Sequence, residues 1–503
     1  MAITFEYFPA NSRASITAVE MKGQKRSLSG NYIPENVLIV GQYDAANTDV
    51  VENERKQLFT ADEFADWFGY GSEIHRQAIW VFEHLGGFSD KVWGVAVPAP
   101  TGTPEAASGD IAFSGTATKA GTFFSSNGGA LGALTVAKGA THTETATALT
   151  AAITASTRMA VSAAASTGTV TVTAKWSGAT GNEIRIVSNP DGAVQEDQNP
   201  EGLTVTVPGS GGYLTSGTGD PDVEGVFFAD GEDNLGDRWF TIITCPYQDS
   251  TALGHYADIA DARRDPTVDR FFASYVGYVG DTYSEAYAIP ATINNESICP
   301  IWDPRSLAPS FEFGAAIAGL VAASATVDPA RPFKTLEVGV PMDTSIDDLL
   351  FAKNDALFRA GMGYCKSIAG KLVVGDLATS YRTNAAGAST EEWFDAVSIH
   401  HRQQKVYSIL SLLNSEPYIR AMLGSDDTPT AKDYVVKPKT LVTDLINLVD
   451  VWASEGWTKN PEAVKETIVA EINSGNNSRL DSSMTDDPAQ ALRQVVTKYA
   501  FLY

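Results

Sequence analysis

The histidines are the residues of this 503-residue chain best suited to acid–base chemistry or metal binding. They are His75, His84, His142, His255, His400 and His401. His400 and His401 lie in a helical pattern, where neighbouring side chains point about 100° apart and do not easily share a metal. The sequence contains no H-E-x-x-H and no G-x-S-x-G motif. We therefore predict surface or interface histidines, no catalytic residue and no enzyme.

A glycine-containing turn and an acidic loop are two further places where chemistry could occur. The run Gly69 to Ser72 precedes a helical pattern, as phosphate-binding loops do, but it follows a helix and lacks a Lys-Ser/Thr pair. We interpret it as a helix stop followed by an N-cap. The acidic cluster comprises Asp220, Asp222, Asp230, Glu232, Asp233 and Asp237. Its spacing does not match an EF-hand loop, so we expect a solvated loop, with no metal and no cofactor.

The charge balance limits the partners of the chain. Asp and Glu number 61 against 36 Lys and Arg, which gives a formal net charge of −25. A field of that sign repels phosphate backbones and anionic membrane surfaces. We expect neither nucleic acid nor a membrane as a partner. The hydrophobic share of 44% with 19% charged residues is typical of folded domains with sizeable cores.

Cysteine usage and the N-terminal sequence indicate the compartment. Cys245, Cys299 and Cys365 are far apart in sequence and form no C-x-x-C pair, so we expect reduced, buried thiols. The first residues, MAITFEYFPANSR, lack the basic and apolar regions of a signal peptide. The apolar stretch Phe311 to Ala325 is too short to span a bilayer. These features predict a protein made for the cytoplasm.

Short apolar runs alternating with helical patterns must supply the framework around these residues. Asn36 to Tyr43 and Val92 to Val97 are apolar runs of strand length, as expected of strands buried on both faces. Between them, a capping box from Thr60 to Glu63 and an N-cap at Ser72 begin two helices. Strand, helix and strand in this order predict a parallel pair with a right-handed crossover.

The same alternation resumes further along the chain. Strands are predicted at Trp239–Cys245, Phe271–Val279, Ile298–Trp302 and Lys371–Val374. Helices are predicted at Thr251–Arg263, Ser310–Ser324, Trp393–Leu413 and Pro438–Trp457. Such repeated units predict an α/β fold built on a doubly wound, mostly parallel sheet.

Composition shifts divide the chain into parts. From residue 101 to 218 it becomes rich in Gly, Thr, Ser and Ala, and two segments alternate with period two, which predicts an inserted all-β, sandwich-like domain with one helix. The predicted parts are an N-terminal arm (1–25), the α/β domain in two segments (26–100 and 219–385), the insertion (101–218) and an α+β C-terminal domain (386–503). We expect the insertion to face outward and to be dispensable for assembly.

Both ends of the chain carry β-prone, aromatic segments outside the α/β pattern. The predicted linking residues are Ile3, Phe5, Tyr7, Val495, Val496, Tyr499 and Phe501. Because an exposed strand is an aggregation hazard in a monomer, we expect these segments to pair with a neighbouring subunit. A separate group of lysines, Lys432, Lys437 and Lys439, stands out in an acidic chain and predicts a charged contact surface.

The order of these motifs resembles the tail sheath family of contractile phage tails, in particular its Mu-like branch. The resemblance rests on Asn36–Gln42, Phe68–Ser72, Val92–Pro98, Ile111–Gly115, Ala120–Thr122, Ser177–Asn182, Trp452–Trp457 and Pro461-Glu462. It covers nearly the whole chain. It implies a subtilisin-like α/β sheath domain, although the sequence shows no protease triad.

The resemblance also implies a function and partners. The chain would polymerise as stacked hexameric rings around the tail tube and contract to drive that tube through the host envelope. Its partners would be further copies of itself, the tail tube protein, and baseplate and tail terminator proteins. The three lysines would face the tube. Assembly would take place in the host cytoplasm and the product would be part of the virion.

Two other classes remain open at this stage. One is a virion surface decoration or adhesin protein that binds through the Gly/Thr-rich insertion. The other is a hydrolase on the α/β domain. Electron microscopy of purified protein distinguishes long hollow sleeves from monomers, and turnover of peptides or esters would identify a hydrolase.

Overall fold

The computed structural model describes residues 32–127, 130–188, 200–209, 211–430 and 432–500. The chain divides into two compact units. The first unit comprises residues 1–32 and 408–489, and the second comprises residues 33–407 and 490–503. Ile3, Phe5, Tyr7 and Phe501 lie outside the described residues.

An eight-stranded sheet in the order β17-β16-β15-β14-β13-β1-β3-β2 forms the centre of the second unit. Its strands are β1 (Val37–Gln42), β2 (Arg55–Gln57), β3 (Val92–Val97), β13 (Ile242–Thr244), β14 (Ala273–Tyr278), β15 (Ile298–Trp302), β16 (Gly363–Ile368) and β17 (Lys371–Asp376). The six inner strands are parallel, whereas β2 and β17 pair antiparallel at the edges. The chain order reverses between β1 and β13, which is the switch point of a doubly wound sheet.

Helices cover both faces of this sheet. They are α1 (Ala61–Phe68), α2 (Glu73–Leu85), α4 (Glu224–Phe227), α5 (Ser250–Arg264), α6 (Tyr283–Ile293), α7 (Ser310–Val327), α8 (Phe351–Ala360) and α9 (Ala396–Leu413). In β1, Val37 and Ile39 pack into one hydrophobic cluster and Leu38 and Val40 into another. Alternate residues of a strand point to opposite faces, so the apolar run predicted from the sequence serves two cores at once.

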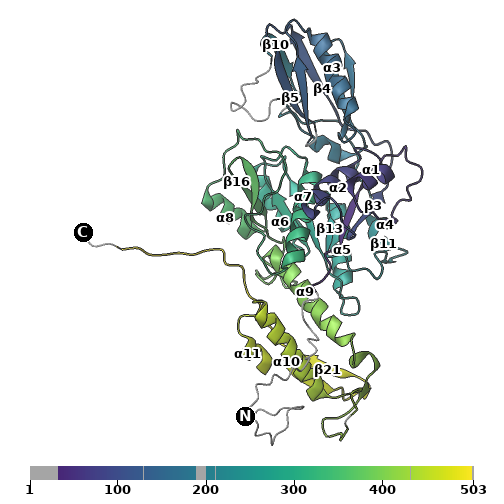
Figure 1. The fold of residues 1–503 in the computed structure, drawn as a ribbon, viewed down its shortest axis with the longest axis vertical. Helices are drawn as coiled ribbons and strands as arrows, with labels where there is room; N and C mark the ends of the chain where they lie inside the picture. The colour runs from purple at the N-terminus through teal and green to yellow at the C-terminus, as the bar shows by residue number, and fades with distance from the viewer. Residues whose placement is uncertain (1–31, 128–129, 189–199, 210, 431, 501–503) are drawn as a thin grey trace, which may run out of the picture. The chain divides into compact units, whose positions relative to one another are not determined.

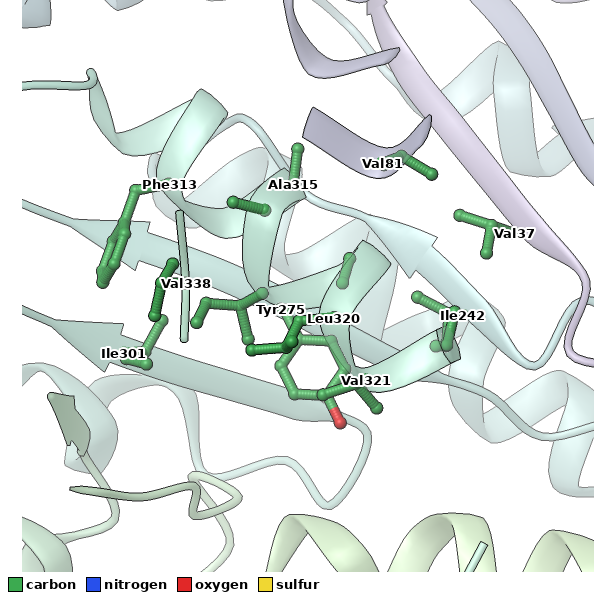
Figure 2. Close-up of a cluster of buried hydrophobic side chains, with 14 of the residues drawn as sticks. Val37, Val81, Ile242, Tyr275, Ile301, Phe313, Ala315, Leu320, Val321 and Val338 are labelled. Atoms are coloured by element: carbon green, nitrogen blue, oxygen red, sulfur yellow. The ribbon is translucent and has the colours of Figure 1, made fainter. Parts of the chain in front are cut away.

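Helix α7 is the central helix of one of these cores. Figure 2 shows its Phe313, Ala315, Leu320 and Val321 side chains among those of the neighbouring sheet and helix α2. Among the described residues, α7 is the one helix long and apolar enough to cross a membrane, with a mean hydropathy of 1.5 and 78% of it buried. The apolar stretch predicted from the sequence was therefore shorter than the helix that forms. The burial of α7 identifies it as a core helix.

The inserted segment has a hydrophobic core of its own. Its elements are β4 (Ser108–Gly115), β5 (Gly121–Asn127), β6 (Ala130–Val136), α3 (His142–Ala155), β7 (Val161–Ser166), β8 (Thr169–Ala174), the 3-10 helix η1 (Ala179–Glu183), β9 (Ile186–Ser188) and β10 (Leu203–Thr206). They form a four-stranded sheet, β10-β4-β8-β7, and a three-stranded sheet, β6-β5-β9 (Figure 1). Helix α3 begins with a complete capping box at Thr141 and Glu144, and its Leu149 and Ile153 side chains are buried.

The first unit is mainly helical, with short strands. It contains η3 (Tyr418–Arg420), β18 (Met422–Leu423), β19 (Val435–Val436), α10 (Pro438–Ser454), α11 (Pro461–Glu466), β20 (Val469–Ile472) and β21 (Leu480–Ser483). One face of α10 buries Leu441, Leu445, Leu448, Val449 and Trp452, the residues that its periodicity predicts. Strands β20 and β21 form an antiparallel hairpin.

Some predicted elements differ from the structure. The run Trp239 to Cys245 supplies only the three residues of β13, and the Asn36 carbonyl accepts the backbone N–H groups of Thr241 and Ile242 at the start of this strand. Helix α9 begins at Ala396, after Asp395. The strand predicted from Val495 is not formed in the part described to residue 500, which has neither helix nor strand (Figure 1).

Candidate functional site

Ser72 and His75 lie close together, but their hydrogen bonds are those of a helix start. The Ser72 Oγ donates to the Gly69 carbonyl at 2.8 Å and accepts from the His75 backbone N–H at 3.4 Å. The His75 Nδ1 accepts from the Gly71 N–H at 2.8 Å. Burial lowers the pKa of His75 to about 3, so this imidazole does not take up a proton near neutral pH. The predicted N-cap is confirmed, since Ser72 caps α2.

His400 and His401 are buried within the chain, as is His75, so the prediction of surface or interface histidines is wrong for these three. The His400 Nε2 lies 3.0 Å from the Tyr275 hydroxyl, and its Nδ1 lies 3.8 Å from a Glu35 carboxylate oxygen. His400 and Glu35 are fully buried side chains. Burial lowers the pKa of both histidines to about 3 and raises the pKa of Glu35 to about 7. The helical period placed both histidines on α9, but Glu35, which lies beside His400, is 365 residues away from it in sequence.

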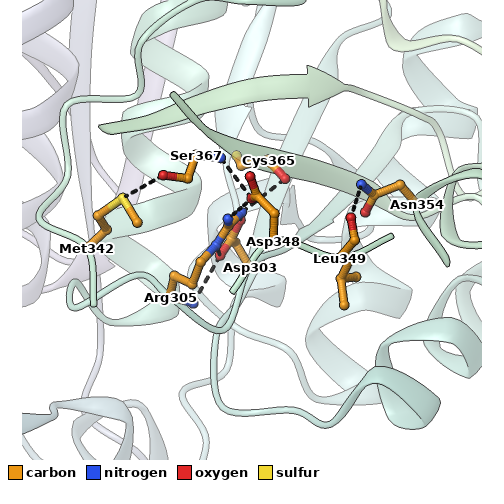
Figure 3. Close-up of polar contacts among 8 residues, drawn as sticks. All are labelled: Asp303, Arg305, Met342, Asp348, Leu349, Asn354, Cys365 and Ser367. Carbon is orange, nitrogen blue, oxygen red and sulfur yellow. Dashed lines mark hydrogen bonds and ion pairs between the residues drawn. The ribbon is translucent and has the colours of Figure 1, made fainter. Parts of the chain in front are cut away.

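The carboxyl edge of the sheet is the place where open α/β folds usually bind ligands. At the end of β15, Arg305 donates to both oxygens of Asp303 at 2.9 and 2.6 Å and also pairs with Asp348 (Figure 3). The Ser367 N–H donates to Asp348 at 2.9 Å, and the Cys365 carbonyl accepts from Arg305 at 3.1 Å. These charged groups satisfy one another, which indicates a structural network and not a ligand site.

The insertion covers another part of this edge. Glu183 of η1 accepts a hydrogen bond from the Ser310 N–H at 3.0 Å, at the N-terminus of α7, where the N-cap residue Pro309 provides no side-chain cap. The Trp176 ring packs edge-on against Phe311, with ring centroids 5.4 Å apart. Burial raises the pKa of Glu183 to about 8. A side chain of the insertion therefore caps the central helix of the α/β domain.

A buried ion pair continues this contact between the insertion and the α/β domain. Arg76 on α2 donates to both oxygens of Glu312 on α7, at 2.8 and 2.7 Å. The same guanidinium donates to the Arg158 carbonyl of the insertion at 2.9 Å. Burial of a bidentate pair of this kind gives a contact of defined geometry. The insertion is thus attached through specific contacts and not only by its two linkers.

The acidic loop is only partly solvated. Asp233 forms a 2.6 Å ion pair with the buried Arg263, so this member of the cluster has a structural role. Asp222, Glu224 and His255 bring their ligand atoms within 4.8 Å of one another, with both carboxylates exposed. Exposed acidic groups on a chain of this charge are ordinary, and the arrangement by itself assigns no metal. The three cysteines are free and buried, as predicted.

The predicted linking residues near the C-terminus are exposed. The exposed fractions are 79% for Val495, 90% for Val496 and 84% for Tyr499. Leu492, just before them, is 67% exposed. Apolar side chains of this size are seldom left in water along a continuous segment. Their pairing with another subunit remains a prediction.

The three predicted contact lysines differ in their surroundings. Lys432 and Lys439 are exposed, whereas Lys437 is partly buried and donates to the Thr428 carbonyl at 2.6 Å. Asp426 accepts a hydrogen bond from the Lys439 backbone N–H at 3.0 Å, so acidic and basic groups share this surface. Exposed apolar residues also belong to this part of the first unit, namely Ile419, Met422 and Tyr434. The surface is therefore mixed, not purely basic.

Comparison with known proteins finds a tail sheath protein similar to this chain along nearly its whole length. The chain is 25% identical over 484 residues, 96% of each chain, to the Mu-like prophage FluMu tail sheath protein of Haemophilus influenzae. This homologue confirms the resemblance found in the sequence, and such homologues are structural proteins and not enzymes. No family model matches the chain.

Solved structures similar to this chain carry related descriptions. A sheath tail protein from Desulfitobacterium hafniense has a TM-score of 0.47 and 10% identity, over 94% of this chain and all of that one. A sheath tail protein from Listeria innocua has a TM-score of 0.46 and 10% identity, over 92% of this chain and 94% of that one. A baseplate structure of the anti-feeding prophage has a TM-score of 0.35 and 13% identity, over 52% of this chain and 68% of that one.

Proposed function

We propose that this chain is the structural subunit of a contractile phage tail sheath. The observation that carries the proposal is the homologue that matches 96% of the chain, because a match of that extent includes both units and the insertion. In this role the subunits stack as hexameric rings around a tail tube, in the virion, and contract to drive the tube through the host envelope. Baseplate and tail terminator proteins lie at the two ends of the sleeve.

Two structural features support a role in assembly. At the carboxyl edge of the sheet, Arg305 pairs with Asp303 and the Ser310 N–H donates to Glu183, contacts within the chain that are typical of a scaffold. The exposed segment from Val495 to Tyr499 supplies apolar side chains whose burial contributes about 1.5–3 kcal/mol each when they add to a neighbour's sheet. Main-chain hydrogen bonds formed by such a strand survive while the linker bends, which a contracting sleeve requires.

The proposed contact with the tube uses Lys432 and Lys439. Surface ion pairs are worth roughly 0–1 kcal/mol each, so a set of them holds while the surfaces touch and is lost when they separate. Lys437 contributes less, because its ammonium group already donates to the Thr428 carbonyl. The lysine pair would therefore release the tube as the sleeve widens.

Truncation of the C-terminal segment tests the assembly role. Removing residues 494–503 takes away only the end of the second unit and leaves Arg493 in place, so the protein is expected to stay folded and to lose the ability to form sleeves. Electron microscopy of purified full-length and truncated protein is the measurement, and circular dichroism checks the fold. Sleeves of normal length from the truncated protein would show that this segment does not link subunits. A full-length protein that never forms sleeves would contradict the proposed function itself.

A further inference from the structure

Two carboxylates from separate elements of the second unit converge on one arginine. Asp376 is the last residue of β17, and Asp395 immediately precedes α9. Asp395 also accepts from the Val397 N–H at 3.2 Å, and Asp376 accepts from the Tyr364 hydroxyl at 2.9 Å. Both side chains are largely buried, with 20% of Asp376 and 13% of Asp395 exposed. Two carboxylates held together in this way require a cation between them.

Arg493 supplies that cation. Its Nε lies 3.1 Å from an oxygen of Asp376, and its Nη2 pairs with Asp395. The guanidinium carbon lies 4.9 Å from the centre of the Phe358 ring. A planar guanidinium presents donors in a rigid fork to two carboxylates while its face lies near an aromatic ring, and a compact ammonium group lacks that fixed geometry. We call Asp376, Asp395 and Phe358 the Arg493 socket.

The residue before Arg493 is attached as well. The Lys334 ammonium group donates to the Leu492 carbonyl at 2.5 Å. From Gln494 to Ala500, every residue is exposed. Arg493 is therefore the last partly buried residue of the described chain. Residues 490–503 belong to the second unit, although the 82 residues before them, 408–489, form most of the first.

We propose that the Arg493 socket anchors the C-terminal arm, defined as residues 494–503, to the second unit. A pull on the arm would then be transmitted to β17 and to the start of α9, the elements that carry the two carboxylates. The mechanical consequence rests on the proposed function, since a neighbouring subunit must hold the arm. The anchor itself does not, because it is a contact within one chain.

Limited digestion of the full chain with trypsin tests the anchor directly. Trypsin cleaves after Arg493, inside the socket, and after Lys498, in the exposed arm. Cleavage after Arg493 requires the arm to detach first, so it reports how often the socket opens. In the parent protein, we expect cleavage after Lys498 to be at least about tenfold faster than cleavage after Arg493, given the worth of charge-assisted hydrogen bonds. Mass spectrometry of the products gives both rates.

Two variants keep a trypsin site at position 493 while weakening the socket. Asp376→Asn removes one charge, and Arg493→Lys replaces the planar group with an ammonium group. Both are expected to speed cleavage at position 493 by about tenfold and to leave cleavage after Lys498 unchanged. Arg493→Lys covers the case in which Asp376→Asn disturbs the fold. Glu462→Gln, which changes an exposed carboxylate paired with Lys465 in the first unit, is the matched control and should change neither rate.

Equal cleavage at both sites in the parent protein, or no change in Arg493→Lys, would overturn the anchor. If the parent forms sleeves, Asp376→Asn sleeves should dissociate at a lower urea concentration than parent sleeves, and equal resistance would overturn the mechanical role. A parent protein that forms no sleeves would contradict the proposed function, while the trypsin result on the monomer would still decide whether the anchor exists.

Discussion

Glu35 and His400 form a buried pair. Their opposite effects on the pH dependence of stability can be measured one at a time. Burial raises the pKa of Glu35 from 4.5 to about 7 and lowers the pKa of His400 from 6.5 to about 3. Between pH 4.5 and 6.5 the folded pair therefore holds one proton on Glu35, while the unfolded chain holds one proton on the histidine. The proton count is the same in both states, so the pair contributes little pH dependence in this range.

Changing one partner should expose the dependence of the other. In Glu35→Gln, the unfolded chain still binds a proton at His400 below pH 6.5 and the folded protein does not, so stability falls as the pH falls. In His400→Gln, the folded protein still holds a proton on Glu35 that the unfolded chain loses above pH 4.5, so stability falls as the pH rises. Each slope is about 1.4 kcal/mol per pH unit, or about 3 kcal/mol over the two units.

Urea titrations of the full chain at pH 4.5, 5.5 and 6.5 measure this effect. Other titrating groups contribute equally to all variants, so the informative quantity is the difference in unfolding free energy between each variant and the parent. The double variant Glu35→Gln, His400→Gln is the matched control and should regain the parent's pH profile. The exchange of a proton between these side chains is refuted if the pH profiles of both single variants deviate from the parent's in the same direction, or if neither deviates. Either result would mean that the proton is not held by Glu35 in the folded protein and by His400 in the unfolded chain. Thr241 and Lys91, which act to lower the pKa of Glu35, and Tyr275, which contacts His400, are unchanged throughout.

Two further predictions concern the central helix α7. Gly319→Ala would place its Cβ 2.7 Å from the Val81 Cα and 3.0 Å from the Val81 carbonyl oxygen, so we expect a loss of about 1–3 kcal/mol and a lower melting temperature. Gly254→Ala on α5, where a Cβ meets nothing within 4 Å, is its control and should stabilise the protein by about 0.5–1 kcal/mol. Glu183→Ala removes the cap of α7 and should cost about 1–2 kcal/mol in urea unfolding, whereas Glu183→Gln, which keeps an acceptor, should cost less. Equal effects of the two Glu183 variants would show that the contact with Ser310 does not act as a cap.

The cap contact also changes the expectation for the insertion. Its composition and its Pro- and Gly-rich borders suggested a part that can be removed. The structure places Glu183 on the N-terminus of α7 and connects Arg158 to the buried pair of Arg76 and Glu312. Deleting the whole insertion would remove these contacts as well. Single substitutions at the contacts therefore test how the insertion stabilises the α/β domain, separately from any role of its outward-facing surface.

Local signals in the sequence determined much of the secondary structure. The apolar run before Tyr43 predicted β1, and Val92 to Val97 matches β3 residue for residue. The caps at Thr60 and Ser72 begin α1 and α2, because an N-cap depends only on a side chain and the backbone two or three residues ahead. The parallel pairing of β1 with β3 followed from the helices between them.

Tertiary structure alone decided which polar groups meet. Arg493 lies 117 residues from Asp376 and 98 from Asp395, and Glu183 lies 127 residues from Ser310. Periodicity reports the face of an element on which a residue lies, but it does not report what covers that face. For this reason His400 could be placed on a helix from the sequence, whereas its burial against Glu35 required the fold. The sequence by itself determined most of the elements, and only long-range packing determined the pairs of side chains that hold the elements together.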